Sequence, residues 1–514
     1  MKSKNSSKWA LFSLNDTSRA IEFGKKLQKL GWNIISTKET LPILLKEKIN
    51  CISINEFTGI EDDYDFPPTL HPKIEKALTE NSVDQIDLVY DIPYGKEIGN
   101  DVGGFTLLAL AAKGNRIPVM NHEDMKKVIN ELKKGLKYFS NKLLQELHDK
   151  ANYEIANHYF DLRTSISKKT SELIMGQYKK KLLNGENPYQ QPCILFKTNN
   201  DSLGLTSFQF HSKVSPCFTN MADLDSILET LTILNKTYLV NYGKVPFISI
   251  ASKHGNPCGI AVNWKTKHKT IIKALHGNPL AIWGGEFICN FKIDEKAAKI
   301  LIKSSHRKKL LGNSDWLLDF VVAPSLNNKA LKLLKKRKNR KILSHPSLVN
   351  LPLRSSYWSY RYVRGGLLKQ PHPHYILNKK NVNLNIKHLD SHIFDDMLIA
   401  WTAASTSFHG GNEVAIAKNG SLLTCSGGPS TVQAVSTAIQ RINEMGHDTK
   451  NSIFAADAFF SFTDAPELLV KIGCTAGVVP LGSKQDKIIK KNFQNTKSRC
   501  FILESIYVDF VGIK

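Results

Sequence analysis

An apolar run, Val245-Pro246-Phe247-Ile248-Ser249-Ile250-Ala251, leads into the polar segment Lys253-His254-Gly255-Asn256-Pro257-Cys258-Gly259. The first run predicts a buried strand, and the Gly and Pro residues after it force the chain into a tight loop. Lys253 and His254 therefore stand side by side at a strand end, where a rigid backbone presents side chains to a cleft. An imidazole there can take a proton from an amine while the ammonium stabilises a developing oxyanion. On this spacing alone, a solvated surface pair is the alternative.

Length and composition indicate a globular protein of several domains. The chain has 514 residues, of which 42% are hydrophobic and 23% are charged, and a chain of this length forms roughly two to four domains. No apolar run reaches the ~18 residues that a membrane span needs, and the basic start Met1-Lys2-Ser3-Lys4 leads into no apolar signal segment. We therefore expect a cytoplasmic protein without a membrane partner.

The net charge of +24 raises the question of an anionic partner. The basic residues are scattered, and the densest run, Lys335-Lys336-Arg337-Lys338-Asn339-Arg340-Lys341, has no interleaved aromatic residue, which indicates a solvated turn rather than a nucleic-acid site. The eight cysteines form no CxxC pair, so neither a metal site nor a disulfide framework is expected. Pro257-Cys258-Gly259 is similar to the PCxxC of zinc deaminases, but position 261 is Ala, so the second thiolate is missing.

Residues 1–137 alternate strand and helix. Strands are predicted at 9–12, 33–35, 51–54, 86–90 and 117–119, with helices at 18–30, 41–48 and 103–113 and from 123 onward. This alternation is typical of a doubly wound parallel sheet that binds ligands at the carboxyl ends of its strands. An apolar stripe then predicts helical structure from 126 to 181. We expect an α/β domain at 1–137, a helical connector at 138–184 and a second region at 185–514.

Several predicted strand ends of the first domain carry polar groups suited to a nucleotide. Ser13 opens one such turn, Thr69 lies in Thr69-Leu70-His71-Pro72-Lys73, and Asp101-Val102-Gly103-Gly104 leads into a helix N-terminus that favours an anion. Helix capping is the structural alternative for each.

The second region carries further motifs at strand ends and turns. Asp464 with Glu467 is also consistent with a helix capping box, and the phenylalanines at 459, 460 and 462 are more typical of a core than of a stacking platform. The motifs are Gly185-Glu186-Asn187-Pro188-Tyr189-Gln190, Trp283-Gly284-Gly285-Glu286, Arg364-Gly365-Gly366-Leu367-Leu368, Asn412-Glu413-Val414-Ala415, Asp457-Ala458-Phe459-Phe460-Ser461-Phe462-Thr463-Asp464 and Gly482-Ser483-Lys484-Gln485-Asp486.

This ordered set resembles the bifunctional purine biosynthesis family, which joins an amino-terminal inosinate cyclohydrolase to a carboxy-terminal aminoimidazole carboxamide ribonucleotide formyltransferase. The similarity covers nearly the whole chain. It implies an α/β fold in which a small doubly wound parallel-sheet domain precedes two cytidine-deaminase-like subdomains without zinc. It also implies a homodimer that binds a nucleotide and 10-formyltetrahydrofolate and uses no metal.

The resemblance also implies site residues. His254 matches the general base, Lys253 and Asn412 match groups that steady the oxyanion and orient the substrate, and Asp101 and Lys113 match catalytic positions for ring closure. Positions for substrate and folate are Asn187, Gly284, Gly285, Phe459, Asp464, Ser13 and Thr69.

The chain departs from the family pattern where substrate and phosphate should bind. Leu183-Asn184 stands where the family has Arg-Tyr, Pro68 where it has Lys, Ile92 where it has Tyr, and Gly410-Gly411-Asn412 where it has Lys-Ser-Asn. Arg361, Arg364 and Lys369 are available as replacement cations. We expect a divergent member whose transferase centre works better than its cyclohydrolase. The alternatives left open are a catalytically inactive nucleotide- or folate-binding homologue and an anion binder.

Overall fold

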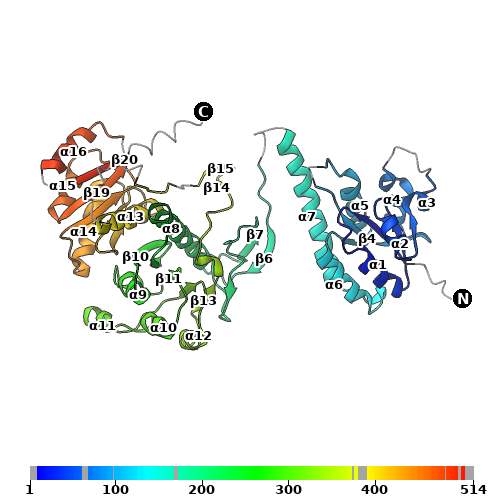
Figure 1. The fold of residues 1–514 in the computed structure, drawn as a ribbon, viewed down its shortest axis with the longest axis horizontal. Coiled ribbons are helices and arrows are strands. Elements are labelled where there is room, and N and C mark those ends of the chain that lie inside the picture. The colour runs from blue at the N-terminus through cyan, green and yellow to red at the C-terminus, as the bar shows by residue number, and fades with distance from the viewer. Residues whose placement is uncertain are drawn as a thin grey trace. The chain divides into compact units, whose positions relative to one another are not determined.

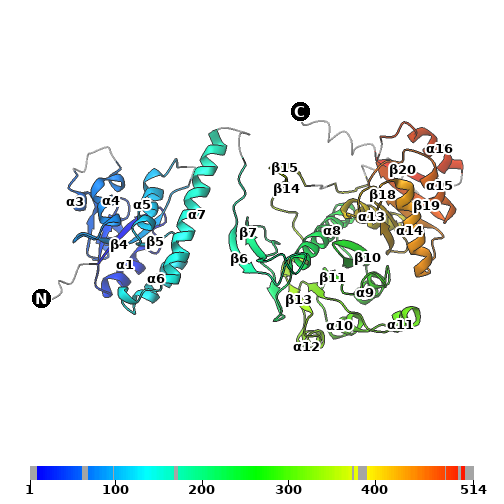
Figure 2. The same cartoon turned by 180° about the vertical axis from the view of Figure 1, so that it is seen from behind.

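The chain folds into two compact units, Met1–Gln177 and Tyr178–Lys514. The computed structural model describes residues 8–60, 67–95, 98–166, 172–372, 375–379, 391–480, 482–495 and 499–503. Each unit has its own sheets (Figures 1 and 2) and its own hydrophobic cores.

The first unit is built on a parallel five-stranded sheet in the order β3-β2-β1-β4-β5. The strand order reverses between β1 and β4, so the carboxyl ends of these two strands form the switch point where doubly wound sheets bind ligands. The strands are β1 (Lys8–Leu14), β2 (Trp32–Ser36), β3 (Cys51–Ser53), β4 (Ile86–Ile92) and β5 (Ile117–Val119).

Helices cover both faces of this sheet, as the alternating pattern predicts. One core lies beneath α1 (Ala20–Lys29), α2 (Leu41–Lys46) and α6 (His122–Leu132). The other lies beneath α3 (Ile54–Thr58), α4 (Pro72–Thr79) and α5 (Val102–Lys113). The long helix α7 (Asn141–Ile166) contributes Leu147 to the first core and Ala151 to the second. Short 3-10 turns lie at Pro68–Leu70 and Leu136–Tyr138.

The predicted helical segment does not extend to Lys181. Helix α7 ends at Ile166, residues 167–171 lie outside the described residues, and Gln177–Lys181 forms strand β6, which pairs with β7 (Ile194–Lys197). Gln177–Lys181 has no apolar residues at helical spacing to pack against a core, so its backbone is satisfied by strand pairing instead.

The second unit contains two sheets that have the same topology, apart from the extra edge strand β8 in the first. The first has the order β10-β9-β11-β12-β13-β8 and the second β17-β16-β18-β19-β20. In each, an antiparallel hairpin is followed by one antiparallel and then two parallel pairings. The strands are β8 (Gln209–Phe210), β9 (Phe247–Lys253), β10 (Asn256–Asn263), β11 (Glu286–Cys289), β12 (Phe320–Ala323), β13 (Lys341–Ser344), β16 (Val414–Ala417), β17 (Leu422–Ser426), β18 (Ser452–Ala456), β19 (Cys474–Pro480) and β20 (Arg499–Leu503).

The two sheets share one core and meet through their hairpins. Helices α8 (Phe218–Tyr242) and α13 (Ser391–Thr406) lie side by side in both views (Figures 1 and 2) and bury their apolar residues with both sheets. An isolated bridge joins Ala261 of β10 to Ser421 just before β17. The outer helices are α9 (Lys267–Leu275), α10 (Glu295–Ile302), α11 (Ser305–Leu311), α12 (Asn328–Leu334), α14 (Thr431–Met445), α15 (Asp464–Lys471) and α16 (Asp486–Asn495). A separate hairpin pairs β14 (Trp358–Val363) with β15 (Gly366–Pro371), and a 3-10 turn lies at Pro346–Leu348.

The basic run at 335–341 is only partly the solvated turn that the sequence predicts. Arg340 is 4% exposed, and its guanidinium donates to the backbone oxygens of Leu318 (3.0 Å) and Leu334 (3.2 Å). Lys341 is also buried, at the start of β13. Burial of Arg340 is tolerated because its planar fork of donors satisfies carbonyl groups that would otherwise lack partners.

Within the described part of the chain, none of the helices is both long and apolar enough to cross a membrane.

Candidate functional site

The loop after β9 is a two-residue hairpin turn. Lys253 ends β9, His254 and Gly255 form the turn, and Asn256 begins β10. Both turn residues have positive φ angles, 53° for His254 and 73° for Gly255, as in the type I′ turns that join twisted strands. A non-glycine residue in this conformation costs roughly 1–2 kcal/mol. The predicted strand and tight loop are confirmed, although the loop is shorter than expected because Asn256–Gly259 belong to β10.

The ammonium of Lys253 is held by the segment before β11. Its Nζ donates to the backbone oxygen of Trp283 at 2.8 Å. Gly284 has a φ of 72°, and a Cβ there would lie 3.0 Å from Lys253 Nζ. A Cβ on Gly285 would lie 2.2 Å from the backbone oxygen of Ser252. The two glycines therefore let this segment approach Lys253 closely, which a side chain would prevent.

A buried pair of acids lies beside Lys253 and His254. Glu286 is 2% exposed and Asp223 8% exposed. Burial, together with the neighbouring Asp223, raises the pKa of Glu286 to about 9, and burial also raises the pKa of Asp223. The pair thus holds a shared proton near neutral pH and keeps one negative charge near the Lys253 ammonium. Glu286 ends the Trp283-Gly284-Gly285-Glu286 motif, but Asp223 belongs to no motif and lies far from it in the sequence, so the pair was not predicted.

Asn256 ties this turn to the loop between α13 and β16. Its Oδ1 accepts from the backbone N–H of Phe408 at 2.7 Å, and its Nδ2 donates to Phe408 O at 3.4 Å. The two loops border a pocket of about 520 Å³, whose lining includes Lys253, His254, Asn256, His409, Cys425 and Arg441. Asn412 lies in the second loop with a φ of 48°, and its Nδ2 donates to Gly428 O at 3.0 Å.

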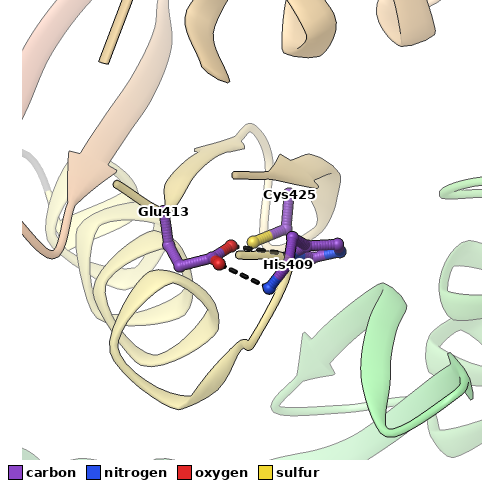
Figure 3. Close-up of side chains that lie close together, drawn as sticks. All are labelled: His409, Glu413 and Cys425. Carbon is purple, nitrogen blue, oxygen red and sulfur yellow. Dashed lines mark hydrogen bonds and ion pairs between the residues drawn. The ribbon is translucent and has the colours of Figure 1, made fainter. Parts of the chain in front are cut away.

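Three ionisable side chains cluster at this pocket (Figure 3). His409 Nδ1 and Glu413 Oε2 are 2.7 Å apart, and the Cys425 Sγ lies close to both side chains. Glu413 is 2% and Cys425 4% exposed. Their spacings of four and twelve residues match no ligand motif, so the cluster was not predicted from the sequence.

Asn412 and the other residues of the second unit that were expected to contact substrate or folate are not among the residues that line this pocket. Asn187 lies in an exposed turn, and its backbone N–H donates to Gln190 Oε1 at 2.7 Å. Phe459 is half-buried in the loop after β18. Gly284 lies against the pocket residue Lys253, and Gly285 lies against Ser252. The loop after β18 begins beside the cluster of His409, Glu413 and Cys425, because the backbone N–H of Asp457 donates to Glu413 O at 3.0 Å.

The capping-box alternative for Asp464 is wrong. Asp464 is the first residue of α15 rather than its N-cap, and its Oδ1 accepts from the N–H of Ala465 at 2.8 Å. The preceding Thr463 makes no side-chain capping bond. Phe460 is buried in a core, as expected, but Phe462 is 63% exposed, so the expectation of a core residue is wrong there.

In the first unit, the polar residues at the switch point come together around the N-terminus of α5. Asp101 is the N-cap, and its Oδ1 accepts from Gly104 N–H at 2.7 Å. A Cβ on Gly103 would lie 2.6 Å from Thr69 Oγ1. The two glycines leave room for side chains to approach the helix end, where peptide dipoles favour negative charge.

A second acid, Asp91 at the end of β4, completes this cluster. A Cβ on Gly104 would lie 2.7 Å from Asp91 Oδ2 and 2.8 Å from Asp101 Oδ2, so the two carboxyl groups lie close together. Asp91 is 1% exposed, and both its carboxyl oxygens lack a hydrogen-bond partner, although Ser13 is nearby. Burial raises the pKa of Asp91 to about 8. The Ser13 side chain lowers this pKa, and the charge of Asp101 raises it. Asp91 is therefore mostly neutral at pH 7.

Lys113 is not brought to this cluster within the unit. Lys113 is the last residue of α5, and the twelve residues of this helix place it about 18 Å along the helix axis from the end that Asp101 caps. The Lys113 side chain is 65% exposed, with its Nζ 3.5 Å from Glu75 Oε1.

Comparisons with known proteins match two family models and several named relatives to this chain. A family model described as AICARFT/IMPCHase bienzyme matches residues 111–441, and one described as MGS-like domain matches residues 19–120. The bifunctional purine biosynthesis protein PurH of Thermoanaerobacter sp. (strain X514) is 28% identical over 530 residues, covering 94% of this chain and 95% of that protein. The PurH proteins of Persephonella marina and Aquifex aeolicus are 26% and 27% identical, covering 93% and 91% of this chain and 95% and 93% of those proteins.

The fold and these matches define an enzyme with an MGS-like parallel-sheet unit ahead of a formyltransferase region. The chain belongs to the AICARFT/IMPCHase bienzyme family, the bifunctional purine biosynthesis proteins. Identities below 30% make it a divergent member.

Proposed function

We propose that the chain transfers the formyl group of 10-formyltetrahydrofolate to the 5-amino group of aminoimidazole carboxamide ribonucleotide, in the pocket beside the β9–β10 turn. The observation that carries the proposal is that a rigid type I′-like turn holds Lys253 and His254 at one pocket of about 520 Å³. A pocket of this size with a few placed polar groups is typical of a small-molecule site.

The chemistry follows from the two side chains at the turn. The amine is a poor nucleophile because its lone pair is delocalised into the imidazole and carboxamide. His254 would accept the amine proton as the new C–N bond forms to the formyl carbon, and would deliver that proton to the folate nitrogen as the bond between this nitrogen and the formyl carbon breaks. Lys253, fixed by Trp283 O, would stabilise the oxyanion formed between these steps. Asn412 on the adjoining loop would orient the reacting groups.

The two sheets of the second unit would be two cytidine-deaminase-like subdomains without the deaminase zinc. Their shared order of one hairpin followed by parallel strands supports this assignment, and Ala261 removes the second cysteine of the PCxxC motif. Homodimer formation is supported by the β14–β15 hairpin, which exposes Trp358, Tyr362 and Leu368. A two-stranded hairpin is marginally stable by itself, and a second copy would cover these side chains.

The first unit would close the formylated intermediate to inosinate with loss of water, at the edge formed by Ser13, Thr69 and Asp101. This step is intramolecular and depends mainly on orientation. Pro68 cannot supply an ammonium group and Ile92 cannot supply a phenol, so we expect this half to be the weaker catalyst. A catalytically inactive nucleotide- or folate-binding homologue is the alternative for the whole chain.

A formyl-transfer assay with the purified full chain tests the proposal. Loss of a general base predicts that His254→Ala lowers the rate by about 10² to 10⁴. His306→Ala is the matched control, because His306 is an exposed imidazole outside the pocket lining. If the unmodified chain binds the nucleotide in calorimetry but produces no formylated product, the inactive homologue is correct. Equal rates for His254→Ala and the unmodified chain would rule out the assigned base.

A further inference from the structure

His409, Glu413 and Cys425 bring three different metal-ligating atoms together in the second unit (Figure 3). His409 lies in the loop after α13, Glu413 immediately precedes β16, and Cys425 is on β17. One ligand atom from each side chain lies within 4.8 Å of the other two. Imidazole nitrogen, carboxylate oxygen and thiolate sulfur are the three donor types that proteins use for Zn²⁺.

The protein is shaped around the Glu413 carboxylate. Its Oε1 accepts from the backbone N–H groups of His409 and Gly411, and its Oε2 lies 2.7 Å from His409 Nδ1. A Cβ on Gly427 would lie 2.5 Å from Oε1, so only glycine leaves room for the carboxylate there. These hydrogen bonds stabilise a carboxylate that is 2% exposed, and a bound cation would compensate its charge.

The thiol of Cys425 completes the donor set from the adjoining strand. It is 4% exposed, and its nearest hydrogen-bond acceptor is Ser407 Oγ at 3.3 Å. A metal ion that binds a thiol displaces the thiol proton, so the donor would be the Cys425 thiolate.

We propose that His409, Glu413 and Cys425 bind Zn²⁺, with a fourth position open to the pocket that His409 and Cys425 line. Zn²⁺ bond lengths of about 2.0–2.3 Å in a tetrahedron place neighbouring ligand atoms about 3.5 Å apart. The ligand atoms lie within 4.8 Å of one another, so side-chain rotations that shorten the longest separation by up to about 1.3 Å and lengthen the 2.7 Å contact between His409 Nδ1 and Glu413 Oε2 complete the site. Binding releases the thiol proton to solvent, and the thiolate and carboxylate together neutralise the ion. The site contains neither Cys258 nor Ala261, so it is separate from the Pro257-Cys258-Gly259 segment of the first sheet.

The test is metal binding by the full chain, with no dependence on formyl transfer. After dialysis against Zn²⁺ and then metal-free buffer, elemental analysis should find one zinc per chain. Co²⁺ in its place should give a near-ultraviolet thiolate-to-cobalt charge-transfer band. Cys425→Ser should lose the band and the retained zinc, whereas Cys289→Ser should keep both. Cys289 is the matched control because it is a fully buried cysteine on β11, outside the cluster.

Two results overturn the proposal. One is a folded, unmodified chain that retains no zinc and shows no cobalt band, which would leave His409 and Glu413 as a proton-sharing pair. The other is a cobalt band that persists in Cys425→Ser. If Cys425→Ser fails to fold, His409→Ala replaces it, because that side chain is 17% exposed. This variant should bind Zn²⁺ at least about 100-fold more weakly, since even outer-shell losses cost 10- to 100-fold, and unchanged affinity would refute the site.

Discussion

Replacing Asp91 with Asn is expected to stabilise the protein, and increasingly so as pH rises. The buried carboxyl keeps its proton up to a pKa of about 8, whereas an unfolded Asp releases it near about 3.9. Between these values the native state binds one proton more than the unfolded state. Stability therefore falls with pH by about 1.36 kcal/mol per unit because of this one group. Asn has the same shape and no proton to lose, so it removes that slope.

The expected gain in the free energy of unfolding is about 1.36 kcal/mol for each pH unit above about 3.9. It is about 1.5 kcal/mol at pH 5 and about 4 kcal/mol at pH 7, as an upper bound for a side chain that is 1% exposed. For a unit of this size, about 4 kcal/mol corresponds to a rise in Tm on the order of 10 °C. Scanning calorimetry of the full chain at pH 5 and pH 7 measures the difference between the variant and the unmodified protein.

Asp84→Asn is the control for the Asp91 experiment. Asp84 is exposed in the same unit, so its replacement should shift Tm equally at both pH values. A Tm difference for Asp91→Asn that stays constant between pH 5 and pH 7 would refute the reasoning. It would mean that the carboxylate is charged in the folded protein and finds a compensating partner.

Three further predictions concern the second unit. Asn256→Ala removes both hydrogen bonds to the Phe408 backbone and should lower stability by roughly 1–3 kcal/mol and slow formyl transfer; unchanged kinetics would show that the loop holds its position without them. Gly284→Ala and Gly312→Ala introduce similar backbone strain, but only the first places a Cβ 3.0 Å from Lys253 Nζ. Both should therefore lower Tm in calorimetry, while only Gly284→Ala should reduce the transfer rate; equal rates would contradict a role for this contact. In isothermal titration, the carboxamide ribonucleotide should bind more tightly than its dephosphorylated nucleoside, and equal affinities would show that the phosphate is no longer recognised.

The sequence alone determined the local features of this protein. Apolar runs and their spacing predicted the parallel sheet of the first unit, because burial on both faces requires apolar strands and helices with one apolar stripe. Gly and Pro placed the turn after β9, and Asp101 ahead of Gly103 marked a helix start, because capping and positive φ angles depend on neighbouring residues. The ordered motifs indicated the family, which the comparisons confirmed.

Only the tertiary structure decided which of these residues meet. It brought Asp91 beside Asp101 and Asp223 beside Glu286, and it separated Lys113 from Asp101 by the length of α5. It also assembled the cluster of His409, Glu413 and Cys425 across a loop and two strands. A carboxyl or thiol has the same letter in the sequence whether it is solvated or buried. Its proton affinity and its partners are set by elements that pack against it from distant parts of the chain.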